Sequence, residues 1–261
     1  MKKAIYHGSL PGGEPAKQFQ LAHDAGFEGI EISACESRED LQKLQSAADS
    51  AGLKIHSIMA GTGGAQPLSS PDQSARQATE QNIAFAIEQA QIVGADTVLV
   101  IPGVVNAEVS YEQAWQRSLP HIKNLAPIAE KAGVTLAIEN VWNKFLLSPL
   151  EFRRYIEEAD SSQIKAYFDC GNILLYGFPD QWIRSLNTLI HRIHVKDFRL
   201  SDRNFCYLLQ GDVPWQKVMA ALRETGYDGY LTVENEVPPY PSSPEQTVFD
   251  ASHALGRILD L

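Results

Sequence analysis

The chain has 261 residues, of which 44% are hydrophobic and 21% charged, and its formal net charge is −10. These values exclude a wholly disordered chain, a collagen-like chain and a small disulfide-stapled scaffold. The acidity argues against a nucleic-acid partner, because such a protein needs a basic surface. The length suits one α/β barrel of about 250 residues or two smaller domains.

Three cysteines, Cys35, Cys170 and Cys206, lie far apart in the sequence and form no CxxC pair. An odd and dispersed set of cysteines favours a reduced, cytoplasmic compartment. The first residues are basic, but no long apolar segment follows them, so we expect no signal peptide. The strongest apolar run, residues 97–105, is far shorter than the ~20 residues of a membrane span, so we expect no membrane association.

Short β-rich runs alternate with longer stretches of helical periodicity along the whole chain. The expected strands are residues 3–6, 29–33, 54–59, 97–101, 134–139, 165–169, 192–196 and 230–234. The expected helices are residues 14–25, 38–51, 73–93, 110–132, 149–159, 179–186, 214–224 and 244–259. Most of the strands are continuous apolar runs, which is typical of parallel strands buried on both faces.

Helix-capping residues support these boundaries. A glycine directly follows five of the helical runs, at Gly26, Gly52, Gly94, Gly133 and Gly226. This is the position where a helix end favours a left-handed residue. Ser148 and Glu151 flank Pro149 with the spacing of an N-cap and its capping box.

Eight strands, each followed by a helix, predict a single-domain (β/α)8 barrel over residues 1–261. A doubly wound sheet is the competing fold. Such a sheet usually has fewer strands, and no Gly-x-Gly-x-x-Gly turn follows the first strand of this chain.

Ionisable residues end four consecutive strands: Glu139, Asp169, His194 and Glu234. A barrel of this kind carries its site at the carboxyl ends of the strands. Three carboxylates placed together there would repel one another unless a counter-charge were present. A divalent cation supplies that charge, and one imidazole with three carboxylates suits Mn²⁺, Mg²⁺, Co²⁺ or Zn²⁺, with Mn²⁺ or Mg²⁺ favoured. The alternative is that these residues form ordinary salt bridges.

Five segments of the sequence form a recognisable set: residues 139–149 (ENVWNKFLLSP), 167–172 (YFDCGN), 194–198 (HVKDF), 211–215 (GDVPW) and 232–234 (TVE). Together they resemble the sugar phosphate isomerase/epimerase family, which has a xylose-isomerase-like barrel. The resemblance covers essentially the whole chain. It is greatest to the L-ribulose/L-xylulose 5-phosphate 3-epimerase and hexulose-phosphate isomerase group, and next to the ketose 3-epimerases. It implies a metal-dependent isomerase or epimerase of a ketose or ketose phosphate.

The resemblance also implies roles for the four strand-end residues. The family holds one divalent metal through Glu, Asp, His and Glu, which correspond to Glu139, Asp169, His194 and Glu234. In related ketose epimerases the two glutamates transfer the proton through a metal-bound enediolate, so Glu139 and Glu234 are implied as the acid/base pair. The chemistry agrees, because proton abstraction from carbon needs a positioned base and a Lewis acid at the developing oxyanion.

Further residues are candidate substrate contacts. Glu31 and His56 lie near the ends of the second and third strands and could bind sugar hydroxyls, or could instead satisfy local backbone groups. Trp142 could stack on a sugar face or belong to the core. Asn172 stands where many relatives carry histidine, which fits the phosphate-sugar group.

Basic residues follow the seventh strand, close to the usual phosphate site of such barrels. We expect Lys196 and Arg199 to hold a substrate phosphate, with a solvated basic loop as the alternative. We expect Asp197 to orient either His194 or Lys196.

Three other functions stay open. A lyase that dehydrates a keto-inositol would use the same enolate, and only product analysis separates it from an isomerase. An apurinic-site endonuclease has a related barrel, but it needs a multi-zinc cluster with many histidines and a basic surface. A non-catalytic sugar-binding barrel is disfavoured by the complete set of four ligands. The partner is expected to be a small sugar or sugar phosphate, and relatives suggest a homodimer or homotetramer.

Overall fold

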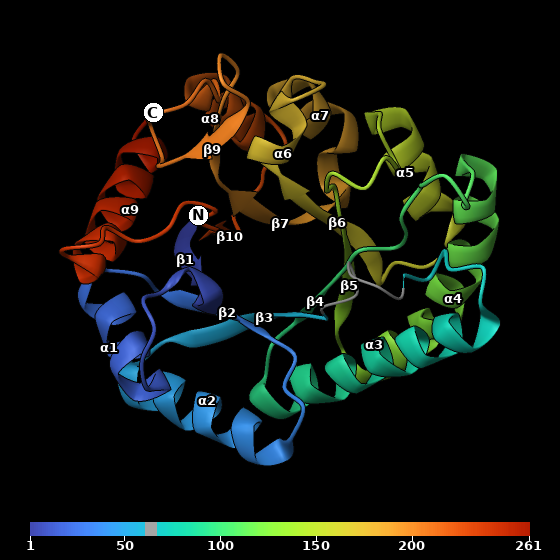
Figure 1. The fold of residues 1–261 in the computed structure, drawn as a ribbon, viewed down its shortest axis with the longest axis horizontal. Coiled ribbons are helices and arrows are strands. Elements are labelled where there is room, and N and C mark those ends of the chain that lie inside the picture. The colour runs from blue at the N-terminus through green and yellow to red at the C-terminus, as the bar shows by residue number, and fades with distance from the viewer. Residues whose placement is uncertain (61–66) are drawn as a thin grey trace.

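The computed structural model describes residues 1–60 and 67–261, and its strands close into a barrel (Figure 1). The barrel strands are β1 (Lys2–Tyr6), β2 (Gly29–Ser33), β3 (Lys54–Met59), β4 (Thr97–Val100), β5 (Thr135–Glu139), β6 (Ile164–Asp169), β7 (Ile190–Val195) and β10 (Tyr230–Val233). All neighbouring strands pair in parallel, and the pairing of β1 with β10 closes the barrel.

Helices surround the barrel on its outside (Figure 1). They are α1 (Pro15–Asp24), α2 (Arg38–Ala51), α3 (Gln73–Val93), α4 (Tyr111–Ala132), α5 (Pro149–Glu158), α7 (Pro179–Leu186), α8 (Trp215–Glu224) and α9 (Pro244–Leu259). The predicted (β/α)8 barrel is therefore confirmed, and each predicted strand and helix is present with ends shifted by two residues at most.

The predicted helix ends have the expected chemistry. Gly52, Gly94 and Gly133 end α2, α3 and α4 in the left-handed conformation, with φ near 70° in each case. The hydroxyl of Ser148 accepts a hydrogen bond from the backbone N–H of Glu151 and so caps α5. These caps satisfy otherwise unpaired backbone groups and so fix where each helix begins or ends.

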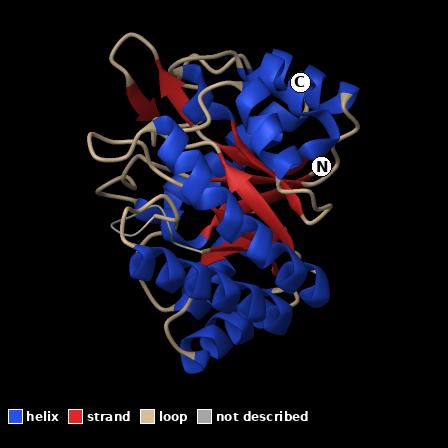
Figure 2. Ribbon diagram, turned by 90° about the vertical axis from the view of Figure 1, so that its right-hand side faces the viewer, coloured by secondary structure: helices blue, strands red, loops and turns tan. Residues whose placement is uncertain are grey.

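Several short elements were not predicted: the 3₁₀ helices η1 (His7–Ser9) and η2 (Asn187–Leu189), the helix α6 (Cys170–Leu174), and the strands β8 (Asp197–Arg199) and β9 (Asn204–Cys206). The last two form an antiparallel hairpin. Figure 2 shows this hairpin projecting at one end of the molecule, on the side where many of the long loops gather.

Asp197 organises the segment around this hairpin. Its buried carboxylate accepts hydrogen bonds from the backbone N–H groups of Phe198, Leu209 and Val213, and from the indole of Trp215. The expectation that Asp197 orients His194 or Lys196 is therefore wrong. The residue faces the returning loop because that loop brings three donors to the carboxylate, in addition to the N–H of Phe198, which satisfies the buried charge.

Apolar side chains fill the space between the barrel and its helices, as in Phe19, Phe152 and Ile183, which are fully buried. Inside the barrel, Leu99, Ala137 and Tyr167 form a small separate cluster. Among the described residues, no helix has both the length and the apolarity that crossing a bilayer requires.

Candidate metal and active site

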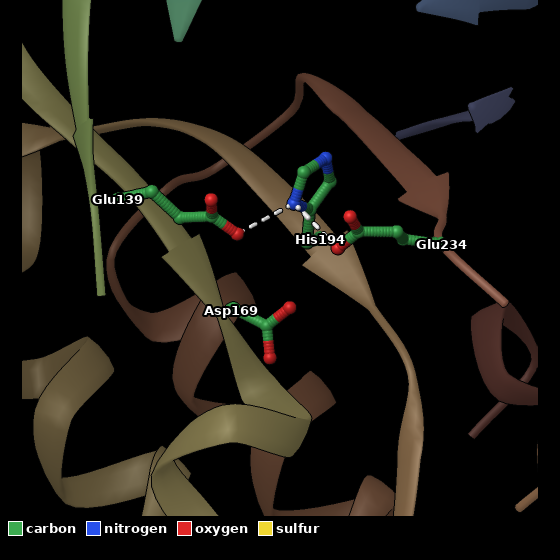
Figure 3. Close-up of side chains that lie close together, drawn as sticks. All are labelled: Glu139, Asp169, His194 and Glu234. Carbon is green, nitrogen blue, oxygen red and sulfur yellow. Dashed lines mark hydrogen bonds and ion pairs between the residues drawn. The ribbon is translucent and has the colours of Figure 1, made fainter. Parts of the chain in front are cut away.

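Four ionisable side chains meet at one end of the barrel. Glu139 ends β5, Asp169 ends β6, His194 lies near the end of β7 and Glu234 directly follows β10. One potential ligand atom from each of these residues lies within 4.8 Å of the others. Figure 3 shows the three carboxylates and the imidazole pointing toward a common centre.

Strand register explains why these residues meet. Asp169 pairs with His194, and His194 pairs in turn with Thr232, two residues before Glu234. Side chains two residues apart on a strand share a face, so Thr232 and Glu234 project on the same side. The predicted meeting of strand-end residues therefore follows from pairing and alternation together.

His194 lies at the centre of the cluster and is fully buried. Its Nδ1 atom is 2.8 Å from Oε1 of Glu139 and 3.2 Å from Oε2 of Glu234. Its Nε2 atom is 2.7 Å from Oε1 of Glu31. Carboxylates thus contact both ring nitrogens of one buried imidazole.

The residues present fit a divalent cation. The Oδ2 atom of Asp169 and the Oε2 atom of Glu234 are buried and have no hydrogen bond of acceptable geometry. Buried carboxylate oxygens are costly unless a cation pairs with them. In this structure the ammonium of Lys196 lies beside both oxygens, and a divalent cation could take the same role. Three carboxylates with one imidazole form a donor set that Mn²⁺ or Mg²⁺ accepts, and that Co²⁺ and Zn²⁺ also tolerate.

The protonation of the cluster reflects its burial. Burial raises the pKa of Glu139 to about 7, although the charge of His194 opposes this shift. Burial would lower the pKa of His194, but the charges of Glu234, Glu31 and Glu139 outweigh it and raise this pKa well above its ordinary value. The carboxylates around His194 thus favour its protonated form in the metal-free protein, and a metal that binds at this imidazole must displace that proton.

Glu31 is a partner of His194. It lies in β2, is fully buried, and contacts the ring nitrogen that faces away from Glu139. This is the arrangement by which a carboxylate fixes the orientation and tautomer of a metal-binding histidine. The structure thus brings Glu31 to the site, but on the side of the His194 ring that faces away from the other three proposed ligands.

The structure does not bring His56 to the cluster. His56 stacks on Tyr230 with ring centroids 4.4 Å apart, and its Nε2 atom is 3.2 Å from the hydroxyl of Thr232. Tyr230 is the first residue of β10, whereas Glu234 follows the end of that strand. His56 therefore lies in the barrel interior at a deeper level than the four ligands.

Two asparagines hold Asp169 in place. The side chain of Asn140 accepts from the backbone N–H of Asp169 and donates to its carbonyl oxygen. The backbone N–H of Asn172 donates to Oδ1 of Asp169 at 2.6 Å, and its side chain donates to the carbonyl oxygen of Asn140. The sequence interpretation missed Asn140, although its place directly after Glu139 was a usable signal.

Trp142 lies beside this network. It is 44% exposed, and its indole N–H donates to the carbonyl oxygen of Asn172. Its ring stacks on Phe205 of the hairpin with centroids 4.8 Å apart and an interplanar angle of 19°. The alternative of a core tryptophan is therefore wrong. The sequence interpretation did not include Phe205, because the hairpin that carries it was not predicted.

The two basic candidates have different surroundings. The buried ammonium of Lys196 lies 2.6 Å from Oε2 of Glu234 and 3.3 Å from Oδ2 of Asp169. Arg199 is partly exposed and pairs with Asp202 within the hairpin. The structure thus brings Lys196 into the cluster and places Arg199 in an ion pair of its own.

Within the described part of the chain, these four residues form the group suited to holding a metal ion, and they include a single histidine. The multi-zinc cluster with many histidines that an apurinic-site endonuclease needs does not match this group.

Comparison with known proteins agrees with this fold. A family model described as xylose isomerase-like TIM barrel matches residues 19–256. The L-ribulose-5-phosphate 3-epimerase UlaE of Salmonella heidelberg is 25% identical, and the match covers 88% of this chain and 85% of that protein. An uncharacterized protein of Methanocaldococcus jannaschii is also 25% identical, but that match covers only 64% of this chain and 60% of that protein.

Among solved structures, the D-psicose 3-epimerase of Clostridium cellulolyticum H10 superposes with a TM-score of 0.82. The sequence identity is 18%, and the match covers 99% of both chains. This likeness shows a shared fold.

Proposed function

Because the chain belongs to the xylose isomerase-like TIM barrel family, we propose that it is a metal-dependent isomerase or epimerase of a ketose or ketose phosphate. The observation that carries this proposal is the meeting of three carboxylates and one imidazole within 4.8 Å at one end of the barrel. The similarity to an L-ribulose-5-phosphate 3-epimerase supports a ketose-type substrate and favours epimerisation.

In this proposal, Glu139, Asp169, His194 and Glu234 hold one divalent cation, with Mn²⁺ or Mg²⁺ favoured. When bound, the cation supplies Lewis-acid stabilisation of the negative charge that develops on the substrate carbonyl oxygen. Glu31 keeps the His194 ring oriented, Asn140 holds the backbone of Asp169, and the backbone N–H of Asn172 holds its carboxylate.

Glu139 and Glu234 transfer the proton in this proposal. They come from β5 and from the end of β10, which are separated in the barrel by β6 and β7. Figure 3 shows their carboxylates approaching His194 from two sides. One carboxylate takes the proton from the carbon next to the carbonyl, and the other returns a proton to the opposite face of that carbon. Two carboxylates on opposite sides of one site suit inversion at carbon.

The remaining candidate substrate contacts differ in where they lie relative to the four proposed ligands. The exposed Trp142 and the partly buried Phe205 form an aromatic surface beside Asn172, and we place a face of the sugar against it. We leave His56 outside the site because of its depth. A phosphate group held by Lys196 and Arg199 stays a prediction, as do a homo-oligomeric state and a cytoplasmic location.

Solvent exchange tests this function. The EDTA-stripped protein is incubated in D₂O with a panel of ketoses and ketose phosphates, with and without Mn²⁺, and followed by proton NMR. We expect metal-dependent incorporation of deuterium next to the carbonyl, lost in Glu139→Gln and in Glu234→Gln. The products are identified as well, because an epimer, an aldose and a dehydrated inositol derivative distinguish an epimerase, an isomerase and a lyase. If the stripped protein binds no divalent cation, the assignment of four ligands is wrong.

A further inference from the structure

Lys196 places its ammonium against oxygens of two of the proposed metal ligands. Its Nζ atom contacts Oε2 of Glu234 and Oδ2 of Asp169, at 2.6 and 3.3 Å. These are the two buried oxygens of the cluster that lack a well-formed hydrogen bond. The side chain of Lys196 is itself only 5% exposed, so its charge is held within the cluster by these carboxylates.

A third carboxylate holds the same ammonium from outside the ligand set. The Oε1 atom of Glu236 lies 3.1 Å from Nζ of Lys196 and accepts a hydrogen bond from it. Glu236 follows β10 and its side chain is 43% exposed. Lys196 therefore bridges a buried pair of ligands and a solvent-facing carboxylate, with its ammonium within 3.3 Å of all three.

On the basis of the proposed metal site, we infer that the ammonium of Lys196 and the metal ion are alternative occupants of one place, and that Glu236 retains the ammonium when the metal enters. A divalent ion and an ammonium within about 4 Å of each other repel strongly in a low-dielectric interior. The metal needs the Glu234 and Asp169 oxygens, so the ammonium gives up these two contacts. It keeps the contact with Glu236, which is not a ligand.

This exchange explains why a lysine lies among metal ligands. Without a metal, the buried oxygens of Glu234 and Asp169 face the ammonium of Lys196, which compensates their charge. The barrel can therefore fold with its site intact before a metal is bound. In return, Lys196 weakens metal binding, because the metal must displace an ion pair.

Metal titration tests the exchange. The dissociation constant (Kd) for Mn²⁺ is measured by calorimetry on EDTA-stripped wild type, Lys196→Met, Lys196→Arg and the control Lys217→Met. Lys217 is an exposed residue of α8, so its loss removes the same charge away from the site. We expect Lys196→Met to bind Mn²⁺ at least about tenfold more tightly than wild type, because the competing cation is gone. Lys196→Arg and Lys217→Met should stay close to wild type.

A double-mutant cycle tests the role of Glu236. In the wild-type background, Glu236→Gln should weaken Mn²⁺ binding by about threefold or more, because the displaced Lys196 ammonium then has no carboxylate at residue 236 to pair with. In the Lys196→Met background the same change should have no effect. An unchanged Kd in Lys196→Met would overturn the exchange, and additive effects in the cycle would overturn the part played by Glu236.

Thermal unfolding, with EDTA and with Mn²⁺, gives a second measurement that is independent of the Mn²⁺ binding isotherms. Lys196→Met should melt at a lower temperature than wild type without metal, and Mn²⁺ should raise its melting temperature by more. Equal responses of the two proteins would contradict the inference. A wild type that binds no Mn²⁺ would refute the proposed function itself, which separates the two failures.

Discussion

Oε1 of Glu31 lies 2.7 Å from Nε2 of His194, and both side chains are fully buried. The two residues come from β2 and β7, on different sides of the barrel. The carboxylate leaves Nδ1, the ring nitrogen near Glu139 and Glu234, as the atom available to the proposed metal.

Replacement of Glu31 tests this positioning role. We expect Glu31→Leu to weaken Mn²⁺ binding by about 10- to 100-fold, because His194 loses its orienting partner. Glu31→Gln, which still accepts a hydrogen bond, should weaken it less. Calorimetry on stripped protein gives both values, and Glu28→Gln, at an exposed residue next to β2, is the control. Wild-type affinity in Glu31→Leu would refute the role.

Removal of either proposed proton-transfer group should affect turnover more than substrate binding. We expect Glu139→Gln and Glu234→Gln each to lower kcat by about 10²- to 10⁴-fold, because the acid/base pair is broken. The measurement is turnover of the ketose identified by solvent exchange, at saturating Mn²⁺. A variant that keeps wild-type kcat would remove that glutamate from the proposed chemistry.

The aromatic surface should contribute mainly to binding. We expect Trp142→Ala to raise KM by about tenfold with a smaller change in kcat, because a sugar face loses its stacking partner. Trp142→Phe should recover part of the loss. Phe178→Ala, at an exposed aromatic residue that is not among the proposed substrate contacts, is the control. Trp182 is unsuitable as a control because it is buried against Phe168. A wild-type KM in Trp142→Ala would place the sugar elsewhere.

Replacement of Asn140 should lower the stability of the metal-free protein. Its side chain satisfies both the backbone N–H and the carbonyl of buried Asp169. Asn140→Leu leaves these two groups unpaired, at a cost of about 1–3 kcal/mol for each group. Urea unfolding of the metal-free protein measures the change. Asn204→Leu, on the exposed hairpin, is the matched control. If the two variants lose equal stability, the network does not hold Asp169.

His56 predicts a pH dependence of stability. Burial, followed by the charge of Arg192, lowers the pKa of His56 well below its ordinary value, with Asp96 opposing and His194 and His191 adding to the shift. The folded protein therefore keeps His56 neutral, whereas the unfolded chain takes up a proton below about pH 6.5. The stabilisation is present above that pH and is lost as the pH falls below it.

The free energy of unfolding should accordingly fall by up to about 1.4 kcal/mol per pH unit from this residue. The test compares wild type with His56→Asn by urea unfolding between about pH 7 and pH 5. Because His194 titrates in both proteins, the difference in slope isolates His56. Parallel slopes would show that His56 is not held neutral.

The sequence allowed the barrel and the meeting of Glu139, Asp169, His194 and Glu234 to be predicted, because apolar runs with polar ends are local signals. The depth of His56 was not predictable in this way. The register of β2 against β3 shifts between Ile30 and Glu31, so position along a strand does not give height in the barrel. The contacts of Lys196 depend on the conformation of its long side chain, which the pattern of apolar and polar residues does not specify.

The hairpin and the contacts of Asp197 escaped prediction for another reason. Each of its strands has three residues, too few for alternation to show. The partners of Asp197 come together only when the loop closes on itself, up to Trp215. The stacking of Phe205 on Trp142 depends on that closure.

All four proposed ligands come from the second half of the chain, from Glu139 onward, while the first half reaches the cluster through Glu31. The two halves of the chain therefore contribute differently to the site. The second half carries the four proposed ligands, and the first half supplies Glu31, which contacts the His194 ring. The loops that follow β1 and β4 contribute none of the four proposed ligands, so sequence changes there leave the ligand set itself unaltered.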